Sequence, residues 1–196
     1  MSDVTVLNVP GLGGSGSQHW QTLWEARDPS FRRVEQRDWN DPVLDEWLEV
    51  LEDAVARAPS PVVLVAHSLG VALVNHWAGQ TRGRVRGALL VAPADVDSKK
   101  HPPEAQRFGP MPLNPLPFMS IVVASENDPY ASLRRARYFA DCWGSRFVDV
   151  EALGHINADS RLGTWDTGFA LLNELLQDTA AQLNTRQGQL SDTTAR

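Results

Sequence analysis

The stretch over residues 61–72, PVVLVAHSLGVA, constrains the fold more than any other part of the chain. Residues 62–66 are apolar on both faces and rich in β-branched side chains, which predicts a buried central strand of a parallel sheet. Apolar residues then recur at helical spacing over residues 69–77, so a helix begins almost at once. The chain must therefore turn sharply between the strand and the helix, and Ser68 lies at that turn.

The turn itself, Ala66-His67-Ser68-Leu69-Gly70, is a variant of the G-x-S-x-G motif with alanine in the first glycine position. Small residues let the strand and the helix pass closely, so that the serine sits on a tight, strained turn with its hydroxyl exposed. The positive end of the following helix favours negative charge that develops beside the serine. The motif and its context together predict that Ser68 is a nucleophile.

Length and composition predict one domain over residues 1–185, followed by a polar, flexible tail over residues 186–196. Acidic residues outnumber basic ones by 24 to 18 without a basic block, so we expect no binding to nucleic acid or to anionic membranes. The single cysteine, Cys142, excludes an internal disulfide framework and fits a reducing compartment. With no secretory signal or membrane-spanning run in view, the sequence predicts a cytoplasmic protein.

Strand-like and helix-like segments alternate along the chain, which predicts an α/β fold with a doubly wound parallel sheet and helices on both faces. The expected strands cover residues 4–9, 31–36, 62–66, 84–91, 120–124 and 146–150. The expected helices cover residues 18–25, 43–58, 132–143 and 165–183, in addition to the helix that begins at residue 69. A proline-rich segment over residues 95–117 is too short for a cap domain, so we expect it to form a partial rim.

In such sheets the functional residues lie on loops at the carboxyl ends of the strands. Ser68 follows the third expected strand, Asp128 the fifth and His155 the sixth. A serine hydroxyl needs a neutral imidazole within hydrogen-bond reach to take its proton. Of the five histidines, His155 alone follows the last strand on a Gly-His loop, and the order Ser, Asp, His along the chain supports it as the base.

The base in turn needs a carboxylate that fixes its tautomer and stabilises the imidazolium. Asp128, held by the proline that follows it, is the predicted carboxylate. Four other acids remain alternatives for this role: Glu126, Asp95, Asp97 and Asp159.

Attack on an acyl carbon places negative charge on its oxygen, and backbone N–H groups commonly stabilise that charge. We predict that one such group belongs to Leu69 and that the other comes from the glycine-rich loop after the first strand. Leu12 is the preferred donor in that loop, with Gly13 second. Gly11, Gly13 and His67 are predicted to bind substrate.

Several short motifs along the chain together resemble the small α/β-hydrolases grouped with retinoblastoma-binding protein nine. The resemblance extends over nearly the whole chain to about Leu183, and the combination is more specific than any single motif. The motifs are Pro10-Gly-Leu-Gly-Gly-Ser, His19-Trp20, Asp38-Trp39, Ala66-His67-Ser68-Leu69-Gly70, Ser125-Glu-Asn-Asp128-Pro and Gly154-His155-Ile-Asn. The resemblance implies an α/β-hydrolase fold with a six-stranded, mainly parallel sheet and no cap domain. It also implies serine hydrolase activity with Ser68, Asp128 and His155 as the catalytic triad.

The leading functional hypothesis is a serine hydrolase that needs no cofactor and cleaves small carboxylic esters, with amides and thioesters left open. Its partner would be a small-molecule acyl substrate, and a protein partner is not indicated. No zinc-binding motif is present, so no metal site is expected. Two alternatives remain: a non-catalytic protein-binding module on the same scaffold, and a perhydrolase or haloperoxidase-like enzyme.

Overall fold

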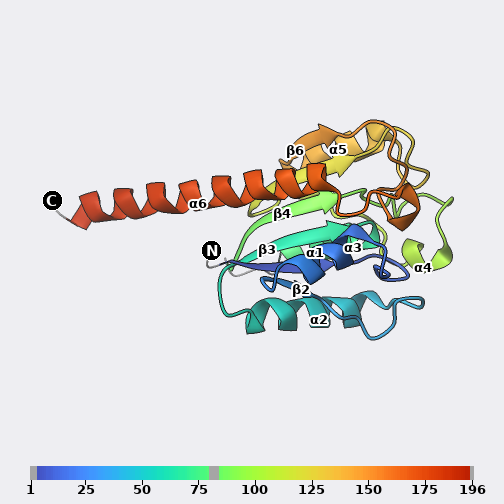
Figure 1. Cartoon of the computed structure of the whole chain (residues 1–196), viewed down its shortest axis with the longest axis horizontal. Coiled ribbons are helices and arrows are strands. Elements are labelled where there is room, and N and C mark those ends of the chain that lie inside the picture. The colour runs from blue at the N-terminus through green and yellow to red at the C-terminus, as the bar shows by residue number, and fades with distance from the viewer. Residues whose placement is uncertain (1–3, 80–83, 195–196) are drawn as a thin grey trace.

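The six segments that the sequence marks as strands form one parallel sheet with the strand order β2-β1-β3-β4-β5-β6. The structure is a computed structural model and describes residues 4–79 and 84–194 (Figure 1). The strands are β1 (Thr5–Val9), β2 (Phe31–Arg33), β3 (Val62–His67), β4 (Val85–Val91), β5 (Met119–Ala124) and β6 (Arg146–Asp149). The predicted α/β-hydrolase architecture with a six-stranded sheet is therefore confirmed.

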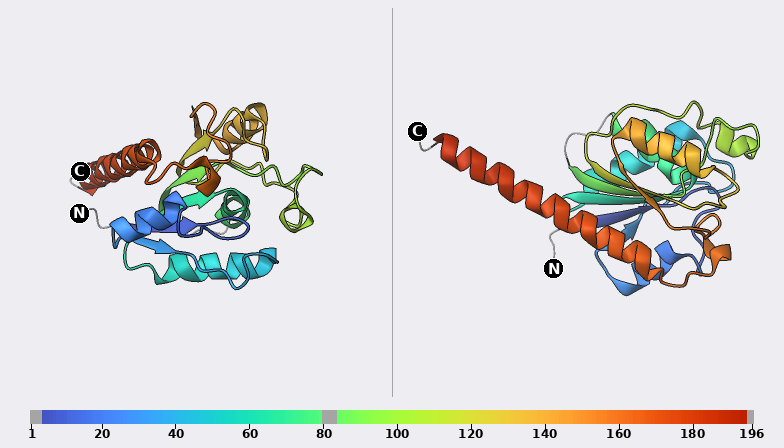
Figure 2. Two further views of the ribbon diagram at one scale, coloured as in Figure 1. Left: turned by 45° about the vertical axis from the view of Figure 1, so that its right-hand side comes forward. Right: turned by 90° about the horizontal axis from the view of Figure 1, so that it is seen from above.

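Helices cover both faces of the sheet (Figures 1 and 2). The helices are α1 (Trp20–Arg27), α2 (Leu44–Arg57), α3 (Leu69–Ala78), α4 (Pro103–Gln106), α5 (Leu133–Trp143) and α6 (Asp166–Thr194). Side chains of α2, α3 and α5 pack into one apolar core, whereas those of α1 and α6 pack into the other. The doubly wound arrangement follows, because each face of a buried parallel sheet needs its own helical layer.

Strand β3 shows why the central segment is apolar throughout. Val62, Leu64 and Ala66 belong to the core on one face, and Val63 and Val65 belong to the core on the other. All five side chains are fully buried. Since successive side chains of a strand point to opposite faces, a strand between two helical layers cannot alternate apolar and polar residues.

The last helix differs from the prediction. The sequence predicts a helix that ends near residue 183, whereas α6 continues to Thr194, and Figures 1 and 2 show it extending well beyond the sheet. That residues 186–196 form a flexible tail stays a prediction, and residues 195–196 lie outside the described part of the chain. Residues 183–194 contain no proline and one glycine, so nothing in this stretch interrupts a helical backbone. The division of the chain at residue 185 stays a prediction. None of the described helices combines the length and the apolarity needed to cross a bilayer.

The proline-rich segment after β4 forms no cap domain. Among the described residues, α4 is its one helix, with four residues, and Figure 1 places it beside the carboxyl ends of the strands. The segment is therefore a rim beside the sheet, as predicted.

Strand β1 passes very close to the start of α3, and glycine makes this contact possible. A Cβ atom on Gly70 would lie 2.2 Å from the carbonyl oxygen of Val9 and 2.7 Å from that of Pro10. A Cβ on Gly11 would lie 2.9 Å from the Cβ of Ser68. The glycine-rich loop after β1 is thereby held directly against the turn that carries Ser68.

Two histidines near the carboxyl ends of the strands, His67 and His19, are buried and neutral near pH 7. Burial lowers the pKa of His67 well below its ordinary value of 6.5, and the neighbouring His155 and His19 add to this effect. Burial, Arg33 and His155 together lower the pKa of His19 to about 4. Both rings lie in the carboxyl-end region of the sheet, where His67 ends β3 and His19 caps α1.

We expect Gly70→Ala to lower the free energy of unfolding by about 3 kcal/mol, because its methyl group meets backbone atoms that cannot move independently. Gly79→Ala is the matched control, since its Cβ meets no described atom within 4 Å and its φ is −66°. The control should be neutral or stabilise by about 0.5 kcal/mol. Urea denaturation measures both variants, and equal stabilities would contradict the close contact.

We also expect the free energy of unfolding to fall as pH drops below 6.5, the ordinary pKa of both histidines. Below this pH the unfolded chain binds a proton at each histidine and the native chain does not. Each histidine therefore contributes up to about 1.4 kcal/mol per pH unit to the slope of the unfolding free energy. For His19 this loss of stability ends near pH 4, where the ring is protonated in the native chain as well. Urea denaturation of wild type and His19→Asn between pH 7 and 5 measures the slope, and an unchanged slope in the variant would contradict the assignment.

Candidate active site

Ser68 stands on a strained turn between β3 and α3. Its φ of 55° and ψ of −120° are unusual for a residue with a side chain. The backbone is held by hydrogen bonds from the Ser68 N–H to Val91 O (3.0 Å) and from the Val71 N–H to Ser68 O (3.0 Å). The turn leaves the hydroxyl at the carboxyl end of the sheet, as the serine motif predicts.

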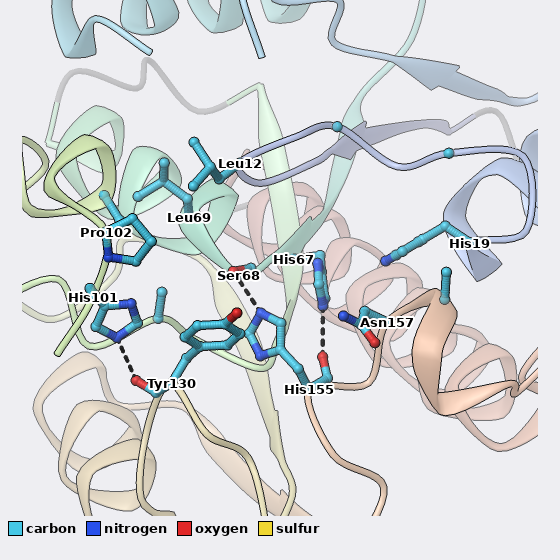
Figure 3. A pocket seen from close by; sticks show the side chains of 15 residues that line it. Leu12, His19, His67, Ser68, Leu69, His101, Pro102, Tyr130, His155 and Asn157 are labelled. Atoms are coloured by element: carbon cyan, nitrogen blue, oxygen red, sulfur yellow. Dashed lines mark hydrogen bonds between the residues drawn. The ribbon is translucent and has the colours of Figure 1, made fainter. Parts of the chain in front are cut away.

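A continuous chain of hydrogen bonds joins Ser68, His155 and Asp128. The Ser68 Oγ lies 2.8 Å from His155 Nε2 (Figure 3). On the other side of the ring, His155 Nδ1 lies 3.0 Å from Asp128 Oδ1 and 2.9 Å from Oδ2. The carboxylate can only accept, so the ring proton lies on Nδ1 and Nε2 is free to accept the serine proton. The side chains of His155 and Asp128 are 8% and 3% exposed, so water competes little for these bonds.

The loops that carry the acid and the histidine are tied directly to each other. Asn127 Oδ1 accepts a hydrogen bond from the Gly154 N–H at 2.6 Å. Ser125 Oγ accepts one from the Leu153 N–H at 2.9 Å and donates to Asn127 Oδ1 at 2.9 Å. These hydrogen bonds join the segment after β5 to the segment after β6. They therefore fix the position of the carboxylate relative to the imidazole.

The four other acids considered from the sequence do not contact His155 in the described part of the chain. Asp95 and Asp97 instead bind the guanidinium of Arg135, at 3.1 Å and 2.7 Å. Asp128 is thus the acid that the structure brings to the imidazole.

The backbone N–H groups of Leu12 and Leu69 lie beside the serine and have no acceptor in the described residues. By contrast, the Gly13 N–H donates to Trp39 O at 2.8 Å. An N–H already engaged in the protein is less suited to receive a substrate oxygen than one that is free. The geometry therefore favours Leu12 over Gly13 as the donor from the glycine-rich loop.

A cavity of about 230 Å³ opens at Ser68 (Figure 3). Its lining comes from the loop after β1, the serine turn, the proline-rich rim and the loops that carry Tyr130 and His155. The lining residues are Leu12, Gly14, Gly16, His19, His67, Ser68, Leu69, Ala94, His101, Pro102, Ala105, Tyr130, His155, Asn157 and Ala158. In Figure 3, Leu12 and Pro102 lie on one side of Ser68, while His19 and Asn157 lie on the other.

Of the three residues predicted to bind substrate, only His67 lines the cavity. Its Nε2–H donates to the carbonyl oxygen of His155 at 2.9 Å, so it also supports the histidine loop. Gly11 and Gly13 are not among the lining residues, because one packs against the serine turn and the other binds Trp39. The structure thus gives both glycines a role in shaping the loop, and substrate binding by either of them stays a prediction.

Four polar lining residues were missed as site residues: His19, His101, Tyr130 and Asn157. Tyr130 and Asn157 each follow a triad candidate by two positions, and that proximity was a usable signal. The Tyr130 ring lies edge-on to His155 with centroids 4.5 Å apart, and the Tyr130 carbonyl binds His101 Nε2 at 2.6 Å. Within the described residues, no group of three or more His, Cys, Asp or Glu side chains is placed to hold a metal ion.

Comparison with known proteins identifies the family of this chain. Residues 6–174 match the family model described as serine hydrolase. A solved structure described as a YdeN-like hydrolase, from Pectobacterium atrosepticum, is 35% identical, with a TM-score of 0.81 over 90% of this chain and 92% of that one. No match was found among curated proteins.

Two more distant structures share the fold. The ydeN gene product of B. subtilis is 18% identical, with a TM-score of 0.71 over 90% of this chain and 100% of that chain. A monoacylglycerol lipase from Paleococcus ferrophilus is 12% identical, with a TM-score of 0.65 over 88% and 93%. None of these three structures is named for retinoblastoma-binding protein nine, so that part of the expected resemblance stays a prediction. The family model and the 35% identical hydrolase together show that the chain belongs to the serine hydrolase family.

Proposed function

We propose that the protein cleaves small carboxylic esters through an acyl-enzyme formed on Ser68. The observation that carries this proposal is the chain of hydrogen bonds from the serine through His155 to Asp128. It supplies a nucleophile, a base for its proton and a carboxylate for the base, all at one end of a cavity. The substrate is a small molecule with an acyl group.

In the first half of the reaction, Ser68 Oγ forms a bond to the carbonyl carbon of the ester while its proton passes to His155 Nε2. Asp128 stabilises the resulting imidazolium and keeps it aligned. The negative charge on the former carbonyl oxygen is met by the free N–H groups of Leu12 and Leu69. The bond to the alcohol oxygen then breaks, and the alcohol leaves with the proton from His155.

In the second half, water replaces the alcohol. His155 takes a proton from that water, whose oxygen bonds to the acyl carbon, and the same two N–H groups hold the new oxyanion. The bond to Ser68 Oγ breaks as the serine regains its proton from the imidazolium. The products are a carboxylic acid and the free enzyme.

The size of the cavity supports small substrates. Its volume of about 230 Å³ lies below the roughly 300–1,000 Å³ of pockets that hold drug-sized ligands. Leu12, Leu69, Pro102 and Ala105 give it an apolar wall. A short acyl chain fits this volume better than a long one. The same steps would apply to a thioester or an activated amide.

We expect Ser68→Ala to lose at least about 10³-fold in kcat/KM on p-nitrophenyl acetate and butanoate, because the nucleophile is gone. The wild type should react with a fluorophosphonate probe, while the variant should not. Ser98→Ala, which removes a hydroxyl outside the cavity lining, should keep both properties.

Undiminished fluorophosphonate labelling of Ser68→Ala would overturn the assignment of the nucleophile. A wild type that hydrolyses no ester from acetate to octanoate, and takes no label, would instead favour a binding role for the scaffold.

A further inference from the structure

His19 has one ring nitrogen engaged and one free. It is the N-cap of α1, where its Nδ1 accepts the Gln21 backbone N–H at 3.2 Å. A nitrogen that accepts a hydrogen bond carries no proton, so the proton of the neutral ring lies on Nε2. Burial and the nearby Arg33 lower the pKa of His19 to about 4, which keeps the ring neutral near pH 7. His19 is therefore a fixed donor through Nε2–H.

That donor is buried and unpaired. His19 is 4% exposed, and no side chain or backbone group among the described residues is a hydrogen-bond partner of its Nε2. A buried donor without an acceptor costs stability, so its persistence at a cavity wall points to an external acceptor. Figure 3 shows the outer end of the ring directed into the cavity, toward His67 and Asn157.

Among the neighbouring polar groups, His67 is a neutral ring with its proton on Nε2, so its Nδ1 is an acceptor. The His67 Nε2–H is already used by the carbonyl of His155. Asn157 Oδ1 accepts the Asp159 N–H at 3.1 Å, while the Asn157 amide nitrogen has no partner among the described residues. This side of the cavity thus offers two free donors, one on His19 and one on Asn157.

We propose that His19 Nε2–H binds an acceptor oxygen of the substrate, so that the preferred esters carry an ether or carbonyl oxygen a few bonds from the scissile carbonyl. The inference rests on the proposed ester hydrolysis and deepens it. It divides the cavity into an apolar wall near Leu12 and Pro102 and a donor wall near His19 and Asn157 (Figure 3). A site with a buried donor discriminates against analogues that lack the acceptor.

Matched ester pairs test this recognition on both sides of the scissile bond. In the acyl pair, p-nitrophenyl methoxyacetate is compared with p-nitrophenyl butanoate. In the alcohol pair, 2-methoxyethyl butanoate is compared with n-butyl butanoate. Each pair differs only in an ether oxygen that replaces a methylene group. The measured quantity is the selectivity, kcat/KM for the ether divided by kcat/KM for the alkyl ester.

Two variants separate recognition from the capping role of the same residue. His19→Asn keeps an acceptor at the position of Nδ1 and caps helices well, but its side chain has no donor at the position of Nε2. His19→Gln does the opposite: its longer side chain can place an N–H at the position of Nε2, but glutamine is a poor helix cap. Comparison between variants cancels the intrinsic reactivity of the esters.

We expect His19→Asn to lose about 3- to 10-fold in selectivity in at least one pair, the effect of one hydrogen bond. His19→Gln should keep more of the wild-type selectivity than His19→Asn. Selectivities in His19→Asn that equal those of the wild type in both pairs would overturn the proposal. So would a larger loss in His19→Gln, which is the pattern of a capping defect.

A binding measurement separates this proposal from the proposed hydrolysis. In Ser68→Ala with ¹⁵N-labelled histidine, the Nε2 resonance of His19 should shift on addition of 2-methoxyethyl butanoate and not of n-butyl butanoate. This shift would support the donor role even if the wild type hydrolysed neither ester. No shift with either ester or with methoxyacetate would contradict the donor role, whatever the turnover.

Discussion

The hydrogen bond between the Ser68 hydroxyl and His155 Nε2 joins parts of the chain that are 87 residues apart. It exists because three parallel strands end at the same edge of the sheet and each is followed by a short, tightly held loop. The serine is set by a strained turn, and the histidine loop is set by Asn127 and Ser125 from the neighbouring loop. The sheet therefore fixes the positions of these loops relative to one another, and the loops carry the reactive side chains.

The fold and the central residues could be predicted because their signals are local. An apolar run of β-branched residues that leads into a helix through a small-residue turn identifies both β3 and Ser68. Asp128 and His155 were found from their order and from their positions after strands. These features depend on backbone geometry and chain direction, which short segments of sequence carry.

Other features depend on contacts between distant segments, and no local pattern shows them. Leu12 is preferred to Gly13 from the sequence, but the hydrogen bond from the Gly13 N–H to Trp39 O that supports this preference is seen only in the structure. The free donor of His19 is visible only once the cavity and its neighbours are in place. The length of α6 was misjudged because its final part lacks the apolar stripe from which helices are usually predicted.

The site combines several features that lower stability: a positive φ at Ser68, a buried unpaired donor at His19 and a neutral buried His67. Such features persist where the surrounding structure compensates for them, as the two apolar cores do here. Their concentration around one cavity is what a preorganised active site requires, since groups already in position need no rearrangement during the reaction.

The central claim is that the Ser68 oxygen carries the acyl group during turnover. Rapid acid quench of the protein during hydrolysis of p-nitrophenyl acetate, followed by intact-mass and peptide mass spectrometry, observes this intermediate directly. The account predicts a mass increase of one acetyl group on the peptide that contains Ser68. Rapid hydrolysis with release of p-nitrophenol but without any acylated serine, under conditions in which deacylation limits the rate, would contradict it.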